Sequence, residues 1–263
     1  MKKKTLALMM TAMMAAALTA CSGKTEETTA APEAGTEAAA EAEGGTLVMA
    51  TNAEFPPYEY YEGGEIVGID VEIAQAVADH LGMTLEVEDM AFDSVIPAVD
   101  SGKADLGAAG LTITEDRQAF VDFSDTYAKA VQSIIVAEGS DITGPEGLAG
   151  KKIGVQLGTT GDIYTSDEFG DENVERYNKG VDAVQALKQG KIDAVVIDNE
   201  PAKVFVEQNE GLVLLETAYA EEEYALAVKK GNTELLDQIN TALADLEESG
   251  ELQKIVDKYI TAE

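Results

Sequence analysis

The sequence predicts an α/β protein made of two similar lobes, and three observations support this class. Short apolar strands alternate with amphipathic helices through most of the chain after residue 45, which is typical of a mostly parallel sheet. Residues 98–106 line up with residues 186–194 at a constant offset of 88 residues. Each copy contains a helix end, a glycine, Lys-x-Asp and an apolar strand. Residues 46–263 suffice for one large or two small domains, and the repeat favours two.

In the first half, the predicted elements follow from apolar periodicity and from glycines that end helices. They are a strand over 47–51, a hairpin over 58–67, a helix over 70–81 ended by Gly82, a strand over 85–87, a helix over 92–101 ended by Gly102, and a strand over 104–108. The helix over 70–81 places Ile73, Ala74, Val77 and Leu81 on one face, so this face is expected to pack on the sheet.

The second half repeats the alternation of strands and helices. Strands are predicted over 132–136, 152–156, 174–177, 192–197 and 212–215, and helices from residue 162, over 181–188 and over 200–208. A returning strand over 224–228 and helices over 233–248 and 252–260 complete the chain. The acidic runs 221–223 and 245–248 are expected to be solvated faces.

Residues 1–20 are predicted to be a secretion signal. Lys2, Lys3 and Lys4 precede an apolar run that is too short to span a bilayer comfortably. The run ends in Leu-Thr-Ala-Cys, which resembles a bacterial lipobox, and Cys21 is the single cysteine. This resemblance implies that Cys21 is lipidated and becomes the new N-terminus. The alternative is a plain signal peptide followed by an incidental cysteine.

Residues 21–45 are predicted to form a lipidated, disordered acidic tether. The segment is dominated by Thr, Ala, Glu and Gly and has no large apolar side chain before Leu47. Such a composition cannot bury enough apolar surface to offset the entropy of ordering the chain. The tether is expected to hold a globular body away from a membrane.

The charge of the chain excludes several classes of partner. The formal net charge is −32, and it becomes more negative when the three N-terminal lysines are removed. Nucleic acids and anionic bilayers both require a basic surface, so neither is an expected partner. The sequence has no Cys/His cluster, no P-loop and no dinucleotide-binding glycine pattern, so neither a metal nor a cofactor is expected.

The most informative stretch is residues 109–117, Ala-Gly-Leu-Thr-Ile-Thr-Glu-Asp-Arg, which follows a predicted strand and leads into a helix. Such a loop offers an α-amino acid carboxylate backbone N–H groups, the hydroxyl of Thr112 and the guanidinium of Arg117, which can hold both oxygens. The alternative is an ordinary strand-to-helix turn in which Thr114 is the N-cap.

The predicted topology gives this loop a counterpart in the second half. In open α/β sheets, ligands bind beyond the carboxyl ends of the strands. The strand that ends near Ala108 leads to the loop with Arg117, and the strand that ends near Ile197 leads to Asp198. A cation from one lobe and an anion from the other match the two charged ends of a zwitterion.

These residues lie within a series of motifs spread over the chain. The motifs are Phe55-Pro56-Pro57-Tyr58-Glu59, Gly68-Ile69-Asp70, Phe92-Asp93, Ile96-Pro97, Gly110-Leu111-Thr112-Ile113-Thr114 with Arg117, Phe123-Ser124, Gly154-Val155, Gly158-Thr159-Thr160-Gly161, and Ile192-Asp193-Ala194 with Asp198. Over residues 46–260 the chain therefore resembles the substrate-binding proteins of bacterial ABC importers for polar amino acids, which are type 2 periplasmic binding proteins of extracellular solute-binding protein family 3.

The resemblance implies a two-lobed fold in which each lobe is a mostly parallel sheet flanked by helices. Lobe 1 is expected to comprise residues 46–129 and 223–263, and lobe 2 residues 130–222. The chain would cross between the lobes twice, through hinge segments at 128–132 and 218–223, so that closure traps the ligand between the lobes.

The resemblance also implies a role for each site residue. Arg117 would bind the ligand carboxylate with the backbone at Gly110 and the hydroxyl of Thr112, and Thr160 would approach it from lobe 2. Asp198 would bind the α-ammonium group, and Phe55 and Phe92 would enclose the side chain. The expected ligand-binding residues are Asn52, Phe55, Phe92, Ala109, Gly110, Thr112, Arg117, Gln156, Thr159, Thr160 and Asp198.

At Asn52 related binders of basic amino acids or glutamine often carry Asp, so no direct salt bridge to a ligand side chain is expected there. Glu54, Gln156 and Asp162 are further candidates for contacts with the side chain. The choice between a neutral and a basic side chain stays open.

The resulting expectation is a monomeric lipoprotein that is not an enzyme. It would be periplasmic or anchored to the outer face of the bacterial cell membrane, where it captures a polar L-amino acid, neutral or basic, and delivers it to an ABC permease. Two alternatives share the fold, namely a ligand-sensing lipoprotein and a dehydratase-like enzyme.

Overall fold

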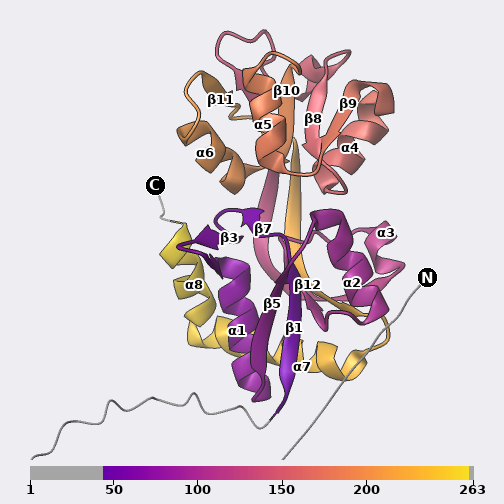
Figure 1. The fold of residues 1–263 in the computed structure, drawn as a ribbon, viewed down its shortest axis with the longest axis vertical. Helices are drawn as coiled ribbons and strands as arrows, with labels where there is room; N and C mark the ends of the chain where they lie inside the picture. Colours follow the sequence, from indigo (N-terminus) through magenta and orange to yellow (C-terminus); the bar gives the residue numbers. More distant parts are fainter. Residues whose placement is uncertain (1–43, 261–263) are drawn as a thin grey trace, which may run out of the picture. The chain divides into compact units, whose positions relative to one another are not determined.

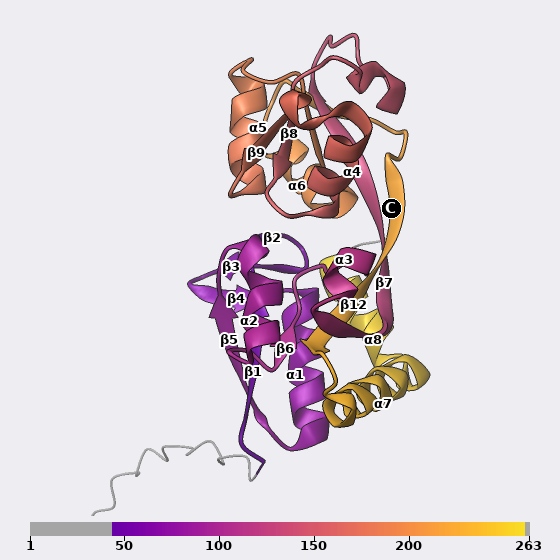
Figure 2. The same cartoon turned by 90° about the vertical axis from the view of Figure 1, so that its right-hand side faces the viewer.

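The computed structural model describes residues 44–260 (Figures 1 and 2). The predicted signal peptide, Cys21 and most of the predicted tether lie outside the described residues. Gly44 and Gly45, assigned above to the tether, are already part of the fold: the Gly44 N–H donates to the Gly82 carbonyl at 3.0 Å, and the Thr84 N–H donates to the Gly45 carbonyl at 2.9 Å. Within the described residues, no helix is both long and apolar enough to span a membrane.

The first lobe contains a parallel sheet with β1 at its centre. Strand β1 (Thr46–Thr51) pairs in parallel with β5 (Thr84–Asp89) on one side and with the short β6 (Leu106–Gly107) on the other. A small antiparallel sheet of β2 (Glu54–Phe55), β3 (Glu59–Glu62) and β4 (Glu65–Val67) contains the predicted hairpin. The helices of this lobe are α1 (Ile69–Leu81), α2 (Val95–Ser101), α3 (Glu115–Gln118), α7 (Thr233–Ser249) and α8 (Glu251–Tyr259).

The second lobe repeats this arrangement around β8 (Ile153–Gln156). This strand pairs in parallel with β9 (Val174–Tyr177) and with β10 (Ala194–Asp198). Helices α4 (Thr160–Phe169), α5 (Gly180–Lys188) and α6 (Asn199–Glu207) and the short strand β11 (Leu212–Leu214) complete the lobe. The predicted α/β class with two lobes and mostly parallel sheets is confirmed.

Two long antiparallel strands connect the lobes. They are β7 (Val121–Ala137) and β12 (Ala220–Lys229), which run side by side between the lobes in Figure 1. Their pairing joins the two parallel sheets into one sheet of order β5-β1-β6-β12-β7-β10-β8-β9. The predicted strand starts at residues 132 and 224 were therefore wrong, because each strand begins earlier. The expected hinge segments are the paired middle of this ribbon, where Lys129 lies opposite Glu223.

The sequence repeat is also a repeat of hydrogen bonds. Gly102 and Gly190 have left-handed φ values of 75° and 67°, which favour glycine. Asp105 then accepts the Val48 N–H at 3.0 Å, and Asp193 accepts the Lys152 N–H at 2.8 Å. In both lobes this Asp carboxylate follows the end of a helix and accepts a backbone hydrogen bond at the neighbouring strand. The Lys-x-Asp pattern therefore has the same structural role in each lobe.

The helices differ from prediction mainly at their ends. The region 92–101 begins with a 3₁₀ turn (Phe92–Ser94) before α2, and α4 begins at Thr160 rather than at residue 162. Helix α1 buries Ile73, Ala74 and Val77 completely, as its periodicity predicts, while Leu81 on the same face is partly buried against the core. Burial of an aliphatic side chain of this size contributes roughly 1.5–3 kcal/mol, which fixes α1 against the sheet.

Candidate ligand-binding site

Arg117 lies in the short helix α3, beyond the carboxyl end of β6. The Thr114 hydroxyl caps this helix by accepting the Arg117 N–H at 3.2 Å, as predicted. The guanidinium is buried and donates to the carbonyls of Thr112 at 2.7 Å and of Gly158 at 3.1 Å, the second of these in lobe 2. Five N–H groups are present on a guanidinium, so donors remain for a further acceptor. The Thr114 cap confirms the structural interpretation of this turn, and the remaining guanidinium donors are compatible with the binding interpretation.

Asp198 is the last residue of β10 in lobe 2 and is also buried. The Tyr224 hydroxyl on β12 donates to its carboxylate. Burial, with a contribution from Glu222, raises the pKa of Asp198 to about 7. An ammonium group placed next to this carboxylate would therefore stabilise its charged form.

One narrow cavity brings Arg117 and Asp198 together. Nine of the eleven residues predicted to bind ligand line it: Phe55, Phe92, Ala109, Gly110, Arg117, Gln156, Thr159, Thr160 and Asp198. Its volume is about 10 Å³, which is hardly room for one water molecule. An amino acid needs far more space, so the lobes would have to separate for one to enter.

Asn52 and Thr112 do not line this cavity, but each is one hydrogen bond away from a residue that does. The Gln156 side-chain amide donates to the side-chain oxygen Oδ1 of Asn52 at 2.9 Å, and the Asn52 side-chain amide donates to the Met90 backbone carbonyl at 2.8 Å. The Gln156 bond joins the two lobes over one end of the cavity. Asn52 and Gln156 thus connect the lobes beside the cavity.

The two acidic candidates for side-chain contacts have other partners. Glu54 forms an ion pair with Lys179 on the opposite lobe. Asp162 accepts the Arg176 Nε–H at 2.7 Å and the Gly158 N–H at 3.0 Å. Asp162 therefore supports the loop before α4, whereas Glu54 keeps one buried oxygen, Oε2, without a hydrogen-bond partner in the described structure.

Asp70 fixes the backbone of the loop that contains Gly110. Its completely buried carboxylate accepts the Gly110 N–H at 2.8 Å and the Tyr127 hydroxyl at 2.7 Å. Burial raises the pKa of Asp70 to about 6. Because the Gly110 N–H is already used, the backbone polar group left at Gly110 is its carbonyl oxygen, which would suit an ammonium group better than a carboxylate.

Glu222 contradicts the expectation that residues 221–223 form a solvated face. Glu221 and Glu223 are exposed, whereas Glu222 is only 7 % exposed. Its Oε2 accepts the hydroxyls of Thr112 and Thr160 and the amide of Gln132, at 3.2, 3.1 and 3.0 Å. Extending the predicted strand back by two residues places Glu222 on the same face as the buried Tyr224, which is a signal for an inward position but does not identify the partners of its carboxylate.

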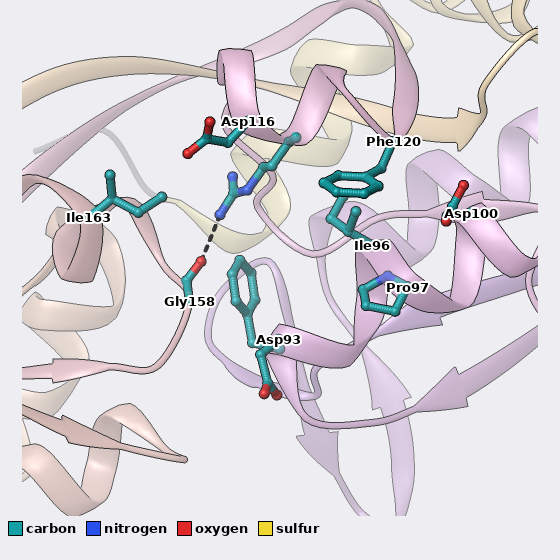
Figure 3. Close-up of a pocket in the computed structure, with 10 residues that line it drawn as sticks. Asp93, Ile96, Pro97, Asp100, Asp116, Phe120, Gly158 and Ile163 are labelled. Atoms are coloured by element: carbon teal, nitrogen blue, oxygen red, sulfur yellow. Dashed lines mark hydrogen bonds between the residues drawn. The ribbon is translucent and has the colours of Figure 1, made fainter.

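A wider groove of about 360 Å³ lies beside Arg117, between the lobes (Figure 3). Phe120, Ile96 and Pro97 form apolar walls, and Asp93, Asp100 and Asp116 add carboxylates. The dashed bond in Figure 3 ends on the Gly158 carbonyl, which marks the point where lobe 2 meets the guanidinium. The Arg117 guanidinium carbon also lies 5.4 Å from the centre of the Phe92 ring, within cation–π range.

Two α/β lobes joined by paired strands, with a cation and an anion facing one interlobe cavity, define a class of two-lobed binding proteins. The sequence matches the model of the bacterial extracellular solute-binding proteins, family 3, over residues 47–262, and the chain belongs to this family. The family is one of binding proteins, in agreement with the expectation that the chain is not an enzyme.

Individual relatives are named for different amino acids and share the fold. The chain is 36% identical to the arginine-binding extracellular protein ArtP of Bacillus subtilis over 99% of both chains. It is 33% identical to a probable histidine-binding protein of Neisseria gonorrhoeae over 96% of this chain and 94% of the relative. A solved ancestral arginine-binding protein bound to glutamine superimposes with a TM-score of 0.78 at 42% identity, covering 82% of this chain and 98% of the other.

Proposed function

We propose that this protein is the extracytoplasmic substrate-binding component of an ABC importer, which captures a polar L-amino acid, neutral or basic, between its lobes and delivers it to a membrane permease. The observation that carries the proposal is the convergence of Arg117 from lobe 1 and Asp198 from lobe 2 on one cavity. Opposite charges that face one cavity are complementary to the carboxylate and the ammonium group of one amino acid.

Each group has a role in this proposal. Arg117 and the hydroxyls of Thr112 and Thr160 bind the carboxylate, and Asp198 with the Gly110 carbonyl binds the ammonium group. Phe55 and Phe92 enclose the aliphatic part of the side chain. Ala109 and Thr159 shape the walls, and the Asn52–Gln156 pair covers the end of the side chain.

Arginine is the first ligand to test, because ArtP is named for it and the chain matches ArtP along nearly its whole length. Asn52 and Gln156 are both amides, which can accept hydrogen bonds from a guanidinium or pair with the amide of glutamine. Glutamine is therefore the matched neutral ligand for comparison.

The test is a thermal-shift screen of the twenty amino acids followed by calorimetry. A ligand at a hundred times its dissociation constant stabilises the folded state by about 2.7 kcal/mol, so binders should be clear. Agmatine, which is arginine without its carboxylate, should bind at least about a hundredfold more weakly than arginine if Arg117 holds the carboxylate. Equal binding of agmatine and arginine would contradict the proposed orientation, and no shift with any amino acid would contradict the function.

The placement of the protein in the cell is part of the same proposal. Cleavage before Cys21 and lipidation of Cys21 would anchor the chain, with residues up to about 43 as the tether, and the body would be a monomer. The lobes would comprise residues 46–129 with 223–263, and 130–222. Incorporation of an alkyne-labelled fatty acid that is abolished in Cys21→Ser would support the anchor, and persistent labelling of that variant would exclude it.

A further inference from the structure

Glu222 is a buried carboxylate that the proposed binding mode does not use. It lies on β12, and one of its oxygens accepts hydrogen bonds from Thr112 of lobe 1, from Thr160 of lobe 2 and from Gln132 on the connecting strand β7. The other oxygen, Oε1, is buried without a hydrogen-bond partner in the described structure. Glu222 is thus the point at which both lobes and the connecting ribbon meet.

The two threonines cannot serve Glu222 and a ligand in the same way at the same time. A hydroxyl carries a single proton to donate. The protons of Thr112 and Thr160 point to Glu222 in the structure, whereas the proposed function requires them to point to the ligand carboxylate. A carboxylate of the protein and a carboxylate of the ligand therefore compete for the same donors.

We propose that Glu222 is an internal competitor of the ligand: its carboxylate occupies the hydroxyl donors of the carboxylate subsite and holds the lobes together until an amino acid takes those donors over. This inference rests on the proposed function and adds a determinant of affinity to it. Two charges of the site act on Glu222 in opposite senses. Arg117 attracts its carboxylate, while Asp198 repels it.

The proposal makes a prediction that a purely structural role would not make. If Glu222 held the threonines ready for the ligand, its removal would weaken binding. If it competes, its removal frees two donors and strengthens binding of any ligand with an α-carboxylate. The apparent dissociation constant scales inversely with the fraction of protein that is competent to bind, so a competitor that is present about nine-tenths of the time costs about tenfold in affinity.

The first experiment measures binding of L-arginine, or of whichever amino acid the screen identifies, by calorimetry to the wild type, Glu222→Ala and Glu222→Gln. We expect the dissociation constant of Glu222→Ala to fall by about tenfold, and that of Glu222→Gln to fall by less, since an amide still accepts hydrogen bonds. Glu223→Gln is the matched control, because this neighbour is exposed on the other face of the strand and its removal should change nothing.

The α-carboxamide of the same amino acid isolates the subsite. It has no carboxylate to compete with Glu222, so its affinity should change far less than that of the acid in Glu222→Ala. Weaker binding of the acid by both Glu222 variants, or equal gains for acid and carboxamide, would overturn the proposal. If the alanine variant does not fold, the glutamine variant decides the same question.

A second experiment does not depend on ligand identity. Small-angle X-ray scattering without added amino acid should give Glu222→Ala a larger radius of gyration than the wild type, because the contact shared by Thr112 and Thr160 is lost. We therefore expect Glu222→Ala to have both a larger radius of gyration and a lower dissociation constant than the wild type. An unchanged radius of gyration would show that Glu222 does not hold the lobes together, and this result does not depend on amino acid binding. Failure of this inference and failure of the proposed function are therefore distinguishable.

Discussion

Two side chains of opposite charge dominate the site at the scale of single residues. Arg117 and Asp198 are both buried. The Arg117 guanidinium donates hydrogen bonds to the Thr112 and Gly158 carbonyls, and the Asp198 carboxylate accepts one from the Tyr224 hydroxyl. Burial lowers the pKa of Arg117, and Glu222 and Asp198 counteract this effect. Each group is therefore positioned before a ligand arrives, which reduces the entropy that binding must overcome.

Removal of either charge should weaken binding strongly. Loss of one member of a buried, hydrogen-bonded charge pair costs about 2–5 kcal/mol, so Arg117→Ala and Asp198→Ala should each raise the dissociation constant at least about a hundredfold. Calorimetry checks this result, with Asp182→Ala as an exposed control.

Arg117→Lys separates charge from geometry at the same position. Lysine keeps the charge but lacks the planar fork that holds both oxygens of a carboxylate, so this variant should also bind weakly. If Arg117→Ala or Asp198→Ala binds the amino acid with near-normal affinity, the substituted residue does not belong to the site.

At the scale of elements, the entry into α1 depends on one glycine. Gly68 precedes the helix with φ 136° and ψ 178°, a conformation that residues with a side chain rarely adopt. A Cβ atom at this position would lie 2.0 Å from the Tyr58 carbonyl oxygen, which is backbone and cannot rotate away. The close approach lets the N–H groups of Ile69 and Asp70 donate to the carbonyls of Pro57 and Tyr58. The start of α1, and with it Asp70 under the Gly110 loop, thus requires glycine.

Gly68→Ala should destabilise the protein by about 1–3 kcal/mol through backbone strain, with the steric clash adding to this cost. Gly63→Ala is the matched control, since Gly63 also has a positive φ, of 63°, but a Cβ there meets nothing within 4 Å. Chemical denaturation of both variants measures the difference. Equal losses of stability would show that the contact with Tyr58 is unimportant.

At the scale of the whole molecule, buried carboxyl groups couple the stability of the fold to pH. Asp70 and Glu59 are both completely buried, and burial, reinforced by the neighbouring Asp70, raises the pKa of Glu59 well above its ordinary value. The pKa of Asp70 is about 6, against an ordinary value of 3.8. The folded state therefore binds more protons than the unfolded state between these two values.

The free energy of unfolding should accordingly fall as the pH rises from about 4 through about 6, because the contribution of protonated Asp70 is lost through its folded pKa. Each unit of pKa shift corresponds to about 1.4 kcal/mol. Urea unfolding across this range should show a shallower decline for Asp70→Asn than for the wild type. An identical slope in both proteins would mean that Asp70 does not titrate in this window.

The sequence determined the α/β class, the two lobes and the strand ends that carry Arg117 and Asp198. These features depend on local periodicity, on glycines that end helices and on the rule that ligands lie at the carboxyl ends of strands. The repeated Lys-x-Asp junction is such a local pattern, and it recurs in the two lobes as the same hydrogen bonds.

Only the tertiary structure decided how β7 and β12 pair and which side chains that pairing buries. Glu222 stands in the acidic run 221–223, and its burial depends on the register that places it opposite Ala130, between Thr112 and Thr160. The Gly110 N–H was likewise expected to serve a ligand, but Asp70, distant in sequence, accepts it. The register of paired strands depends on contacts between residues far apart in the sequence, and so do the hydrogen-bond donors that the two lobes share. A short stretch of sequence therefore does not determine them.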